Sequence, residues 1–146
     1  MKHFYVINGP NLNLLGQRNP EIYGTRTLSD LEKALDDYFQ DRSVKLSHFQ
    51  SNHEGALIDW LHQAHHQKID GVLLNAGAYT HYSYALHDAI EAIQVPVIEV
   101  HLSDIASRIE RWRHTSVIAP VVTQSFKGDG IQSYFNAIDY LLDLSD

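Results

Sequence analysis

Three polar clusters hold the side chains of this sequence that are best suited to acid–base chemistry. They occupy residues 8–23, 75–81 and 101–103, and each directly follows a short apolar run. The first carries Arg18 and Tyr23, and a fixed positive charge near a tyrosine favours its phenolate, which is a base. The third begins with His101, whose imidazole titrates in the range useful for proton transfer. Taken in isolation, these residues have ordinary structural explanations as well: a solvated loop charge, a packed ring and a hydrogen-bonded histidine.

Other catalytic chemistries have little support in the sequence. Cysteine is absent, which removes disulfides, thiolate nucleophiles, iron–sulfur clusters and cysteine-ligated zinc sites. The motifs GxxxxGK[ST], GxSxG and HExxH are missing as well. His62 and His66 have the i, i+4 spacing of a metal-ligand pair, but no third ligand is near them, so we interpret them as part of a solvated helix face. Residues 128–133 form an incomplete GxGxxG before the last expected helix, which favours a helix-entry turn over a dinucleotide site.

Length and charge narrow the class of protein further. The chain has 146 residues, the usual size of one domain, and 18 acidic against 11 basic residues give a net charge of −7 with neutral histidine. No run of Lys or Arg occurs, which argues against nucleic acid or an anionic membrane as the main partner. The apolar run at the N-terminus is too short for a signal peptide, and no stretch approaches the roughly 20 apolar residues of a membrane span. We therefore expect a single cytoplasmic domain, residues 1–146.

Short apolar runs alternate with amphipathic segments along the chain. The expected strands are 4–7, 44–50, 71–75, 97–100 and 117–122. The expected helices are 28–40, the apolar stripes at 57–64, 85–93 and 131–142, and the arginine-rich segment 105–113. Overlapping capping boxes that begin at Thr27 and Ser29 mark the start of the first helix. Pro120 suits a strand at the edge of a sheet better than a central one.

Five strand–helix repeats predict an α/β fold, a doubly wound parallel sheet with helices on both faces. For five strands in one domain, the flavodoxin-like order 2-1-3-4-5 is the leading expectation. In that order, ligands bind beside the carboxyl ends of strands 1 and 3, where the strand order reverses. The polar clusters follow strands 1, 3 and 4, so this fold would bring them to one crevice. The first cluster belongs to about 20 residues without helical periodicity, which is typical of a lid or a binding loop.

Five blocks of the sequence resemble one known enzyme family. They read, in chain order, GPNLNLLGQRNPEIYG, QSNHEGALIDWLHQA, LNAGAYTHYSYALHDAI, PVIEVHLSDI and GIQSY. Together they span nearly the whole chain and are similar to blocks of type II 3-dehydroquinate dehydratase. The resemblance implies a flavodoxin-like fold, no cofactor or metal, and trimers packed into a homododecamer. It also implies dehydration of 3-dehydroquinate to 3-dehydroshikimate, in the shikimate pathway or in quinate breakdown.

Dehydration beside a ketone needs a base for the carbon proton, stabilisation of the enolate and an acid for the departing hydroxyl. The resemblance assigns the base to Tyr23, with Arg18 lowering the cost of ionising it, which is about 4 kcal/mol for an ordinary tyrosine at neutral pH. His101 matches the proton donor to the hydroxyl, and Asn11 matches a residue that holds a water against the enolate oxygen. Glu99 lies two residues before His101 on the same strand face, where it would fix the imidazole tautomer or be a plain buried carboxylate.

A substrate with a carboxylate and several hydroxyls needs fixed amide and hydroxyl donors and at least one cation. The positions that match substrate-binding residues of the family are Asn75, His81, Asp88, Leu102, Ser103 and Arg113. His81 and Asp88 are seven residues apart, which places them on one helix face if the helix begins early enough. The Leu102 N–H and Ser103, at an expected helix N-terminus, suit the carboxylate. Taken singly, Asn75, Asp88 and Ser103 have equally common roles as a turn former, a surface charge and an N-cap.

The arginine-rich segment departs from the family pattern. The chain reads HLSDIASRIERWRHTS where the family commonly reads HxSNxHAREEFRHHS, so one residue is inserted and Arg108 and Arg113 are five apart instead of four. In a regular helix, this turns one arginine away from the other by about a third of a turn or less. We therefore expect Arg113 to bind the substrate, and Arg108 to be shifted or replaced in its role by Arg111.

Two alternatives from other classes remain. A flavodoxin-like small-molecule binding protein would keep the fold and lose turnover through the altered arginine-rich segment. A flavin carrier is the other alternative, although no obvious phosphate-binding loop follows the first strand. The joint presence of Arg18, Tyr23 and His101 favours an active enzyme.

Overall fold

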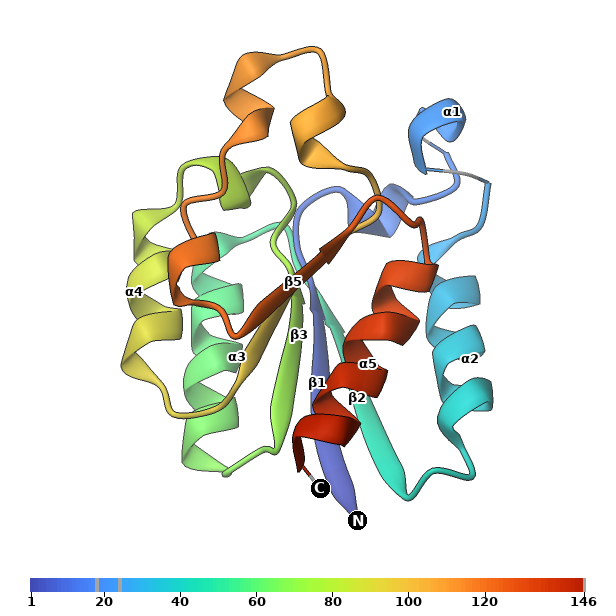
Figure 1. Cartoon of the computed structure of the whole chain (residues 1–146), viewed down its shortest axis with the longest axis vertical. Coiled ribbons are helices and arrows are strands. Elements are labelled where there is room, and N and C mark those ends of the chain that lie inside the picture. Colours follow the sequence, from blue (N-terminus) through green and yellow to red (C-terminus); the bar gives the residue numbers. More distant parts are fainter. Residues whose placement is uncertain (18, 24, 146) are drawn as a thin grey trace.

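Five parallel strands form the central sheet (Figure 1). They are β1 (Lys2–Asn8), β2 (Val44–Gln50), β3 (Gly71–Asn75), β4 (Val97–His101) and β5 (Gln124–Lys127). Their order in the sheet is β2-β1-β3-β4-β5, which confirms the predicted flavodoxin-like topology. The computed structural model describes residues 1–17, 19–23 and 25–145, with the side chains of Ile22, Tyr23 and Ser145 outside that description.

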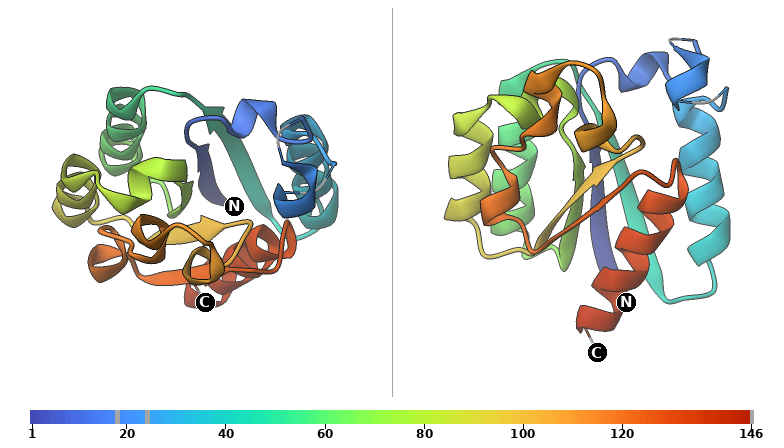
Figure 2. Two further views of the ribbon diagram at one scale, coloured as in Figure 1. Left: turned by 90° about the horizontal axis from the view of Figure 1, so that it is seen from above. Right: turned by 45° about the horizontal axis from the view of Figure 1, so that its top comes forward.

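Helices cover both faces of this sheet, as Figures 1 and 2 show. α2 (Leu28–Phe39) and α5 (Gln132–Ser145) lie on one face, and α3 (Glu54–His66) and α4 (Tyr84–Ala92) lie on the other. Alternate side chains of a strand point to opposite faces, so β1 contributes to two cores. Phe4 and Val6 are buried with residues of α2 and α5. Tyr5 and Ile7 are buried with residues of α3 and α4.

Local signals set the helix starts that the sequence predicts. At α2, the Thr27 hydroxyl accepts from the Asp30 N–H and the Asp30 carboxylate accepts from the Thr27 N–H, each at 3.0 Å, which confirms a capping box. Ser83 caps α4 by accepting from the Leu86 N–H at 3.0 Å. Gly128 and Gly130, with φ of +90° and +58°, form the turn into α5, as expected for helix entry.

The prediction of the fifth strand is wrong in position. Residues 117–122 form no strand, and β5 begins only at Gln124. Ala119–Val121 is a 3-10 turn with Pro120 in its first positions, where the missing proline N–H costs nothing. The apolar run exists because Ile118 is fully buried in the core beside α3 and α4, with its apolar neighbours packed around it. β5 does lie at the edge of the sheet.

The predicted helix over 105–113 is also wrong. This segment forms two 3-10 turns, Ile105–Ser107 and Arg111–His114, and the backbone at Arg108 is extended. Local bonds compete with helix formation here, because Asp104 accepts from the Ala106 N–H through its side chain and from the Ser107 hydroxyl through its carbonyl. The segment also lacks an apolar stripe that could be buried against the sheet, since Ile109 is 95% exposed.

The carboxyl ends of all five strands meet at one edge of the sheet, the top of Figure 1. The loops that follow β1, β3 and β4 lie together there, and so does the short helix α1 (Pro20–Tyr23). Both chain termini lie at the opposite edge. This arrangement places the three polar clusters of the sequence side by side.

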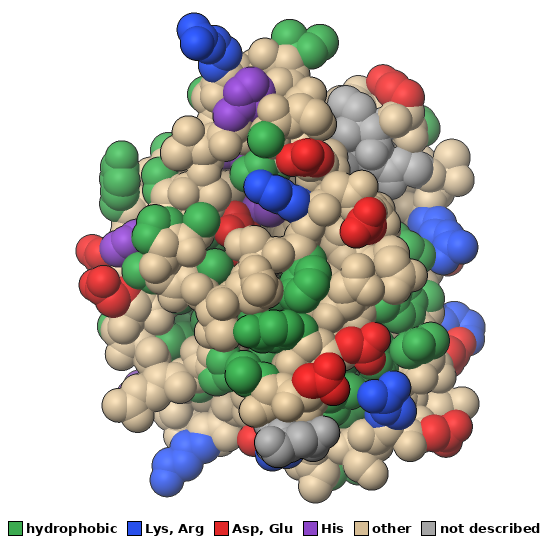
Figure 3. Space-filling model, in the orientation of Figure 1, with side chains coloured by type: hydrophobic (Ala, Val, Ile, Leu, Met, Phe, Trp, Pro, Cys, Tyr) green, Lys and Arg blue, Asp and Glu red, His purple; other side chains and the backbone are tan. Residues whose placement is uncertain are grey.

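Two properties of the surface bear on partners. None of the described helices is long and apolar enough to cross a lipid bilayer. On the face shown in Figure 3, Lys and Arg side chains are dispersed among Asp and Glu side chains. The described residues on this face therefore form no continuous basic surface.

Candidate active site

A cavity of about 150 Å³ lies at the carboxyl ends of β1, β3 and β4, beside the point where the strand order reverses. Seven residues expected from the sequence line it: Asn11, Asn75, His81, His101, Leu102, Ser103 and Arg113. The strand order therefore brings polar side chains from three separate loops to one place, as predicted. Leu12, Ala78 and Ile105 add an apolar part of the wall that carried no chemical signal in the sequence.

His101 and Glu99 form a buried pair at the end of β4. Nε2 of His101 lies 2.7 Å from Oε2 of Glu99, and the two side chains are 7% and 2% exposed. Burial alone raises the pKa of Glu99, but hydrogen bonds from His101, Ser116 and Ser125, with the charge of His101, outweigh it and hold the pKa below its usual 4.5. An ionised carboxylate only accepts hydrogen bonds, so Nε2 donates and Nδ1 is the ring nitrogen left for the cavity. The geometry therefore favours the tautomer-fixing role of Glu99.

A buried tyrosine fixes the amide of Asn75. Nδ2 of Asn75 donates to the Tyr134 hydroxyl at 2.8 Å, and its Oδ1 accepts from the Gly77 N–H at 3.1 Å. The Tyr134 hydroxyl in turn donates to Oδ1 of Asn8 at 2.6 Å, and burial raises the pKa of Tyr134, so it stays a neutral phenol. One N–H of Asn75 thus remains for the cavity. From the sequence alone, Tyr134 is expected only as part of the apolar stripe of the last helix.

His81 presents an acceptor to the cavity. Its Nδ1 lies 2.8 Å from the carbonyl oxygen of Thr115, which can only accept, so Nδ1 carries the hydrogen and Nε2 has a free lone pair. Burial lowers the pKa of His81, and the charges of His101 and Arg113 act in the same direction. His81 is therefore neutral at neutral pH and can accept a hydrogen bond from a hydroxyl group.

Two arginines line the cavity, although the inserted residue predicts that Arg108 is shifted or replaced in its role by Arg111. Arg108 lines it as well, and its Nη1 donates to the Ser103 hydroxyl at 3.3 Å. Arg111 is exposed and is not part of the cavity wall, whereas Arg108 is. Since the segment is no regular helix, the five-residue spacing imposes no rotation. Arg113 is held by Glu110, whose Oε2 accepts from Nε at 3.1 Å.

The turn after β1 presents Asn11 to the cavity. Asn11 has a left-handed backbone with φ of 69°, and its N–H donates to Oδ1 of Asn52 at 3.0 Å. Just before it, Gly9 passes so close to the loop after β3 that a Cβ atom would lie 2.8 Å from the Ala76 carbonyl oxygen. Glycine at this position lets the two loops pack together, and Asn11 and Asn75 thereby line the same cavity.

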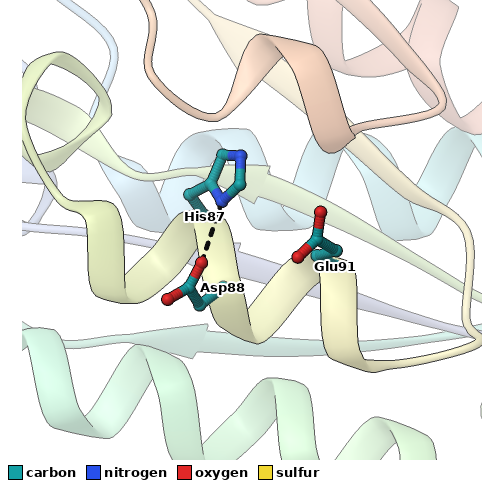
Figure 4. Close-up of side chains that lie close together, drawn as sticks. All are labelled: His87, Asp88 and Glu91. Atoms are coloured by element: carbon teal, nitrogen blue, oxygen red, sulfur yellow. Dashed lines mark hydrogen bonds and ion pairs between the residues drawn. The ribbon is translucent and has the colours of Figure 1, made fainter.

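The structure does not bring Asp88 to this cavity. His81 ends the 3-10 turn Gly77–His81 and α4 begins separately at Tyr84, so the two residues do not share one helix. The Asp88 side chain is 79% exposed and pairs with His87 at 3.1 Å, with Glu91 one turn further along α4 (Figure 4). Ligand atoms of these three side chains lie within 4.8 Å of one another, but none of the three lines the cavity.

Other sequence predictions have different outcomes. Arg18 and the side chain of Tyr23 lie outside the described residues. His62 and His66 are exposed on α3, in agreement with a solvated helix face. Ser116 and Ser125, which donate to Glu99, were missed because one follows a segment expected to be helical and the other belongs to the strand that was misplaced.

A doubly wound sheet with a polar crevice at its strand ends is the architecture of α/β enzymes that bind small molecules at this position. The family model described as Dehydroquinase class II matches residues 2–142, and the chain belongs to this family.

Similar proteins agree with that assignment. The chain is 52% identical over 146 residues to a 3-dehydroquinate dehydratase of Bacillus licheniformis, which covers 100% of this chain and 99% of the relative. It is 50% identical to one of Caldicellulosiruptor bescii, with 100% of both chains covered. A crystal structure of a type II dehydroquinase from Butyrivibrio crossotus superposes with a TM-score of 0.93 at 42% identity, covering 96% of this chain and 97% of that one.

Proposed function

We propose that the chain is a 3-dehydroquinate dehydratase, a hydro-lyase that converts 3-dehydroquinate to 3-dehydroshikimate in the shikimate pathway. The observation that carries this proposal is the His101–Glu99 pair at a cavity that also holds Arg108 and Arg113, in a chain of the class II dehydroquinase family. The pair supplies an acid, and the arginines supply cations for an anionic substrate. Residues 1–146 would act as one catalytic domain.

The first step is removal of the carbon proton beside the ketone. Tyr23 as phenolate takes this proton, and Arg18 stabilises the phenolate; both roles rest on the sequence motif. The electron pair of the broken C–H bond moves toward the ketone and forms an enolate. A water held by Asn11, which lines the cavity, donates a hydrogen bond to the enolate oxygen.

The second step is loss of the hydroxyl. The electron pair of the enolate forms the carbon–carbon double bond while the C–O bond breaks, and the charged imidazole of His101 donates its Nδ1 proton to the departing oxygen, which leaves as water. Glu99 keeps the second ring nitrogen occupied, since Nε2 donates to it at 2.7 Å. Tyr23 has gained one proton and His101 has lost one. Net transfer of one proton from Tyr23 to His101 therefore restores the starting state of the enzyme.

Substrate binding uses the rest of the cavity wall. The carboxylate fits beside the Leu102 N–H, Ser103 and Arg108, where the arginine already donates to the serine hydroxyl. Asn75 offers one N–H, and His81 offers an acceptor, to the substrate hydroxyls. The substrate would thus be oriented by fixed donors and acceptors that need no reorganisation.

The test is to follow the ultraviolet absorbance of the conjugated enone when purified, chelator-treated protein is mixed with 3-dehydroquinate. Turnover by the wild type that collapses in Tyr23→Phe would support a metal-free and cofactor-free dehydratase with Tyr23 as base. Tyr38→Phe, which removes an exposed hydroxyl from α2, is the matched control and should retain full activity. Substrate binding without turnover would instead identify a binding protein on the same fold.

Assembly and location complete the proposal. By analogy with its family, the chain would assemble as a homododecamer, a tetramer of trimers, and act in the cytoplasm. Light scattering coupled to size exclusion measures the mass of the assembly directly. A mass equal to that of a monomer would contradict this assembly and leave the single-chain chemistry to be judged by turnover.

A further inference from the structure

A second cavity, of about 190 Å³, lies next to the substrate cavity and shares His101 with it. The polar side chains that line it are Glu99, His101, His114, Ser116, Ser125 and Lys127. Of these, only His101 also lines the substrate cavity. Side chains that line the second cavity can therefore hold His101 in place without contacting the substrate.

Two serine hydroxyls converge on the Glu99 carboxylate in this cavity. Oγ of Ser116 donates to Oε2 at 2.6 Å, and Oγ of Ser125 donates to Oε1 at 2.8 Å. Because His101 also donates to Oε2, both oxygens of the carboxylate are occupied. The carboxylate cannot rotate about its last bond without breaking at least one of these three bonds.

The backbone places both hydroxyls independently of substrate. Ser125 lies directly beside Glu99 in the register of β4 and β5, so its side chain is on the same face of the sheet. Ser116 Oγ accepts from the Ala119 N–H at 3.1 Å, and its single hydrogen is therefore directed at Glu99. Neither serine lines the substrate cavity.

We propose that Ser116 and Ser125 are positioning residues for the proton donor His101: they lock Glu99 in the one orientation that keeps Nε2 of the imidazole protonated and Nδ1 directed to the substrate. The inference rests on the proposed function for the role of His101 as acid. The structural part of the inference is that the two serine hydroxyls, through the Glu99 carboxylate, set the tautomer of the His101 imidazole. This part does not depend on turnover.

Loss of these hydroxyls has a defined electrostatic consequence. Each hydrogen bond favours the carboxylate form, so removing both raises the pKa of Glu99 from its depressed value. Protonated Glu99 would no longer hold the imidazole by its Nε2 hydrogen. The other titratable or charged groups near this pair are His81, Arg108 and Arg113 in the wall of the substrate cavity, and His114 and Lys127 in the wall of the second cavity. The serine substitutions change none of these groups, so the change in pH dependence is attributable to Glu99.

The experiment compares Ser116→Ala, Ser125→Ala and the double variant with the wild type in turnover of 3-dehydroquinate over a pH series. We expect kcat to fall about 10-fold for each single variant with KM unchanged, and the acidic limb of the kcat profile to move up by about one pH unit for each hydroxyl removed. Ser125→Thr keeps a hydroxyl on a β-branched side chain that suits a strand, and it should restore both quantities. Ser29→Ala, an exposed serine of α2, should leave them unchanged.

A direct readout keeps the inference separate from the proposed function. The ring ¹⁵N signals of His101, identified by their loss in His101→Gln, should show the hydrogen on Nε2 in the neutral wild-type imidazole and a tautomer mixture in the double variant. If the wild type shows no turnover, the proposed function fails and these signals alone decide the inference. If the double variant is unfolded by circular dichroism, the single variants decide it. Unchanged signals and an unmoved acidic limb, or a rise in KM with kcat unaffected, would overturn it.

Discussion

The hydroxyl of Tyr134 in α5 donates a hydrogen bond of 2.6 Å to the side-chain oxygen of Asn8 at the end of β1, 126 residues away in the chain. The same hydroxyl accepts from Nδ2 of Asn75 at the end of β3. All three side chains are buried, so one phenol joins the last helix to two strand ends at the site. A single hydroxyl thus couples the stability of the fold to the orientation of a cavity residue.

Replacing this tyrosine by phenylalanine should therefore affect both properties. Tyr134→Phe leaves a buried acceptor on Asn8 and a buried donor on Asn75 without partners, which should lower the free energy of unfolding by about 2–4 kcal/mol. KM for the substrate should rise because the Asn75 amide is no longer fixed. Urea denaturation and steady-state kinetics measure the two effects, and Tyr38→Phe should change neither by a measurable amount. A Tyr134→Phe protein as stable as the wild type would contradict the role of the phenol.

His81 should bind the substrate as a neutral acceptor. Burial lowers its pKa below the usual 6.5, so Nε2 keeps its lone pair above that pH and loses it only as the pH falls through the lowered value. KM of the wild type should be flat above about pH 6.5 and should rise below the lowered pKa. His81→Ala should raise KM about 10-fold above pH 6.5, and the difference from the wild type should shrink below the lowered pKa. His62→Ala, on the exposed face of α3, is the control. A KM that decreases on acidification would mean that a charged His81 attracts the substrate carboxylate instead.

The three arginines of the segment 105–113 should separate by position. Arg108 and Arg113 line the cavity and Arg111 does not, so Arg108→Ala and Arg113→Ala should each raise KM by about 10- to 100-fold, while Arg111→Ala should leave it unchanged. Added salt should weaken substrate binding to the wild type more than to either cavity variant, because a charged contact is already missing there. If Arg111 replaced Arg108 in substrate binding, Arg111→Ala would raise KM and Arg108→Ala would leave it unchanged.

The sequence predicts most of the fold because its signals are local and agree with one another. The expected strands at 44–50 and 71–75 coincide with β2 and β3, and the capping box at Thr27 starts α2 as expected. The position of β5 is not predicted by such local signals, because β5 is a short edge strand, Gln-Ser-Phe-Lys, with one half-buried phenylalanine. A more apolar run just before it is buried for another reason, which is the packing of Ile118 in the core.

The site is predictable to the same extent. Residues that end predicted strands, such as Asn75 and His101, are found at the cavity because parallel strands bring their carboxyl ends together. The place of Arg108 in the cavity wall does not follow from helical spacing, because local side-chain bonds form 3-10 turns in this segment. Ser125 depends on the register of β4 and β5, which no local pattern specifies. Contacts between side chains of neighbouring strands therefore cannot be predicted from local sequence patterns.

The depressed pKa of Glu99 should also be visible in the pH dependence of stability. A carboxyl group whose pKa is lower in the folded chain binds its proton first in the unfolded chain, so its contribution to stability is complete above the usual pKa of 4.5 and declines as the pH falls through the folded value. Glu99→Gln removes this carboxylate and leaves one of its three donors facing an amide N–H, which should cost about 1–3 kcal/mol at neutral pH. The stability difference between wild type and variant should stay constant above about pH 4.5 and shrink below it.

Denaturation with urea at a series of pH values measures the difference, with Glu91→Gln on the exposed face of α4 as the control. A difference that grows on acidification would show that Glu99 is protonated in the folded protein, and it would remove the anion that holds Nε2 of His101.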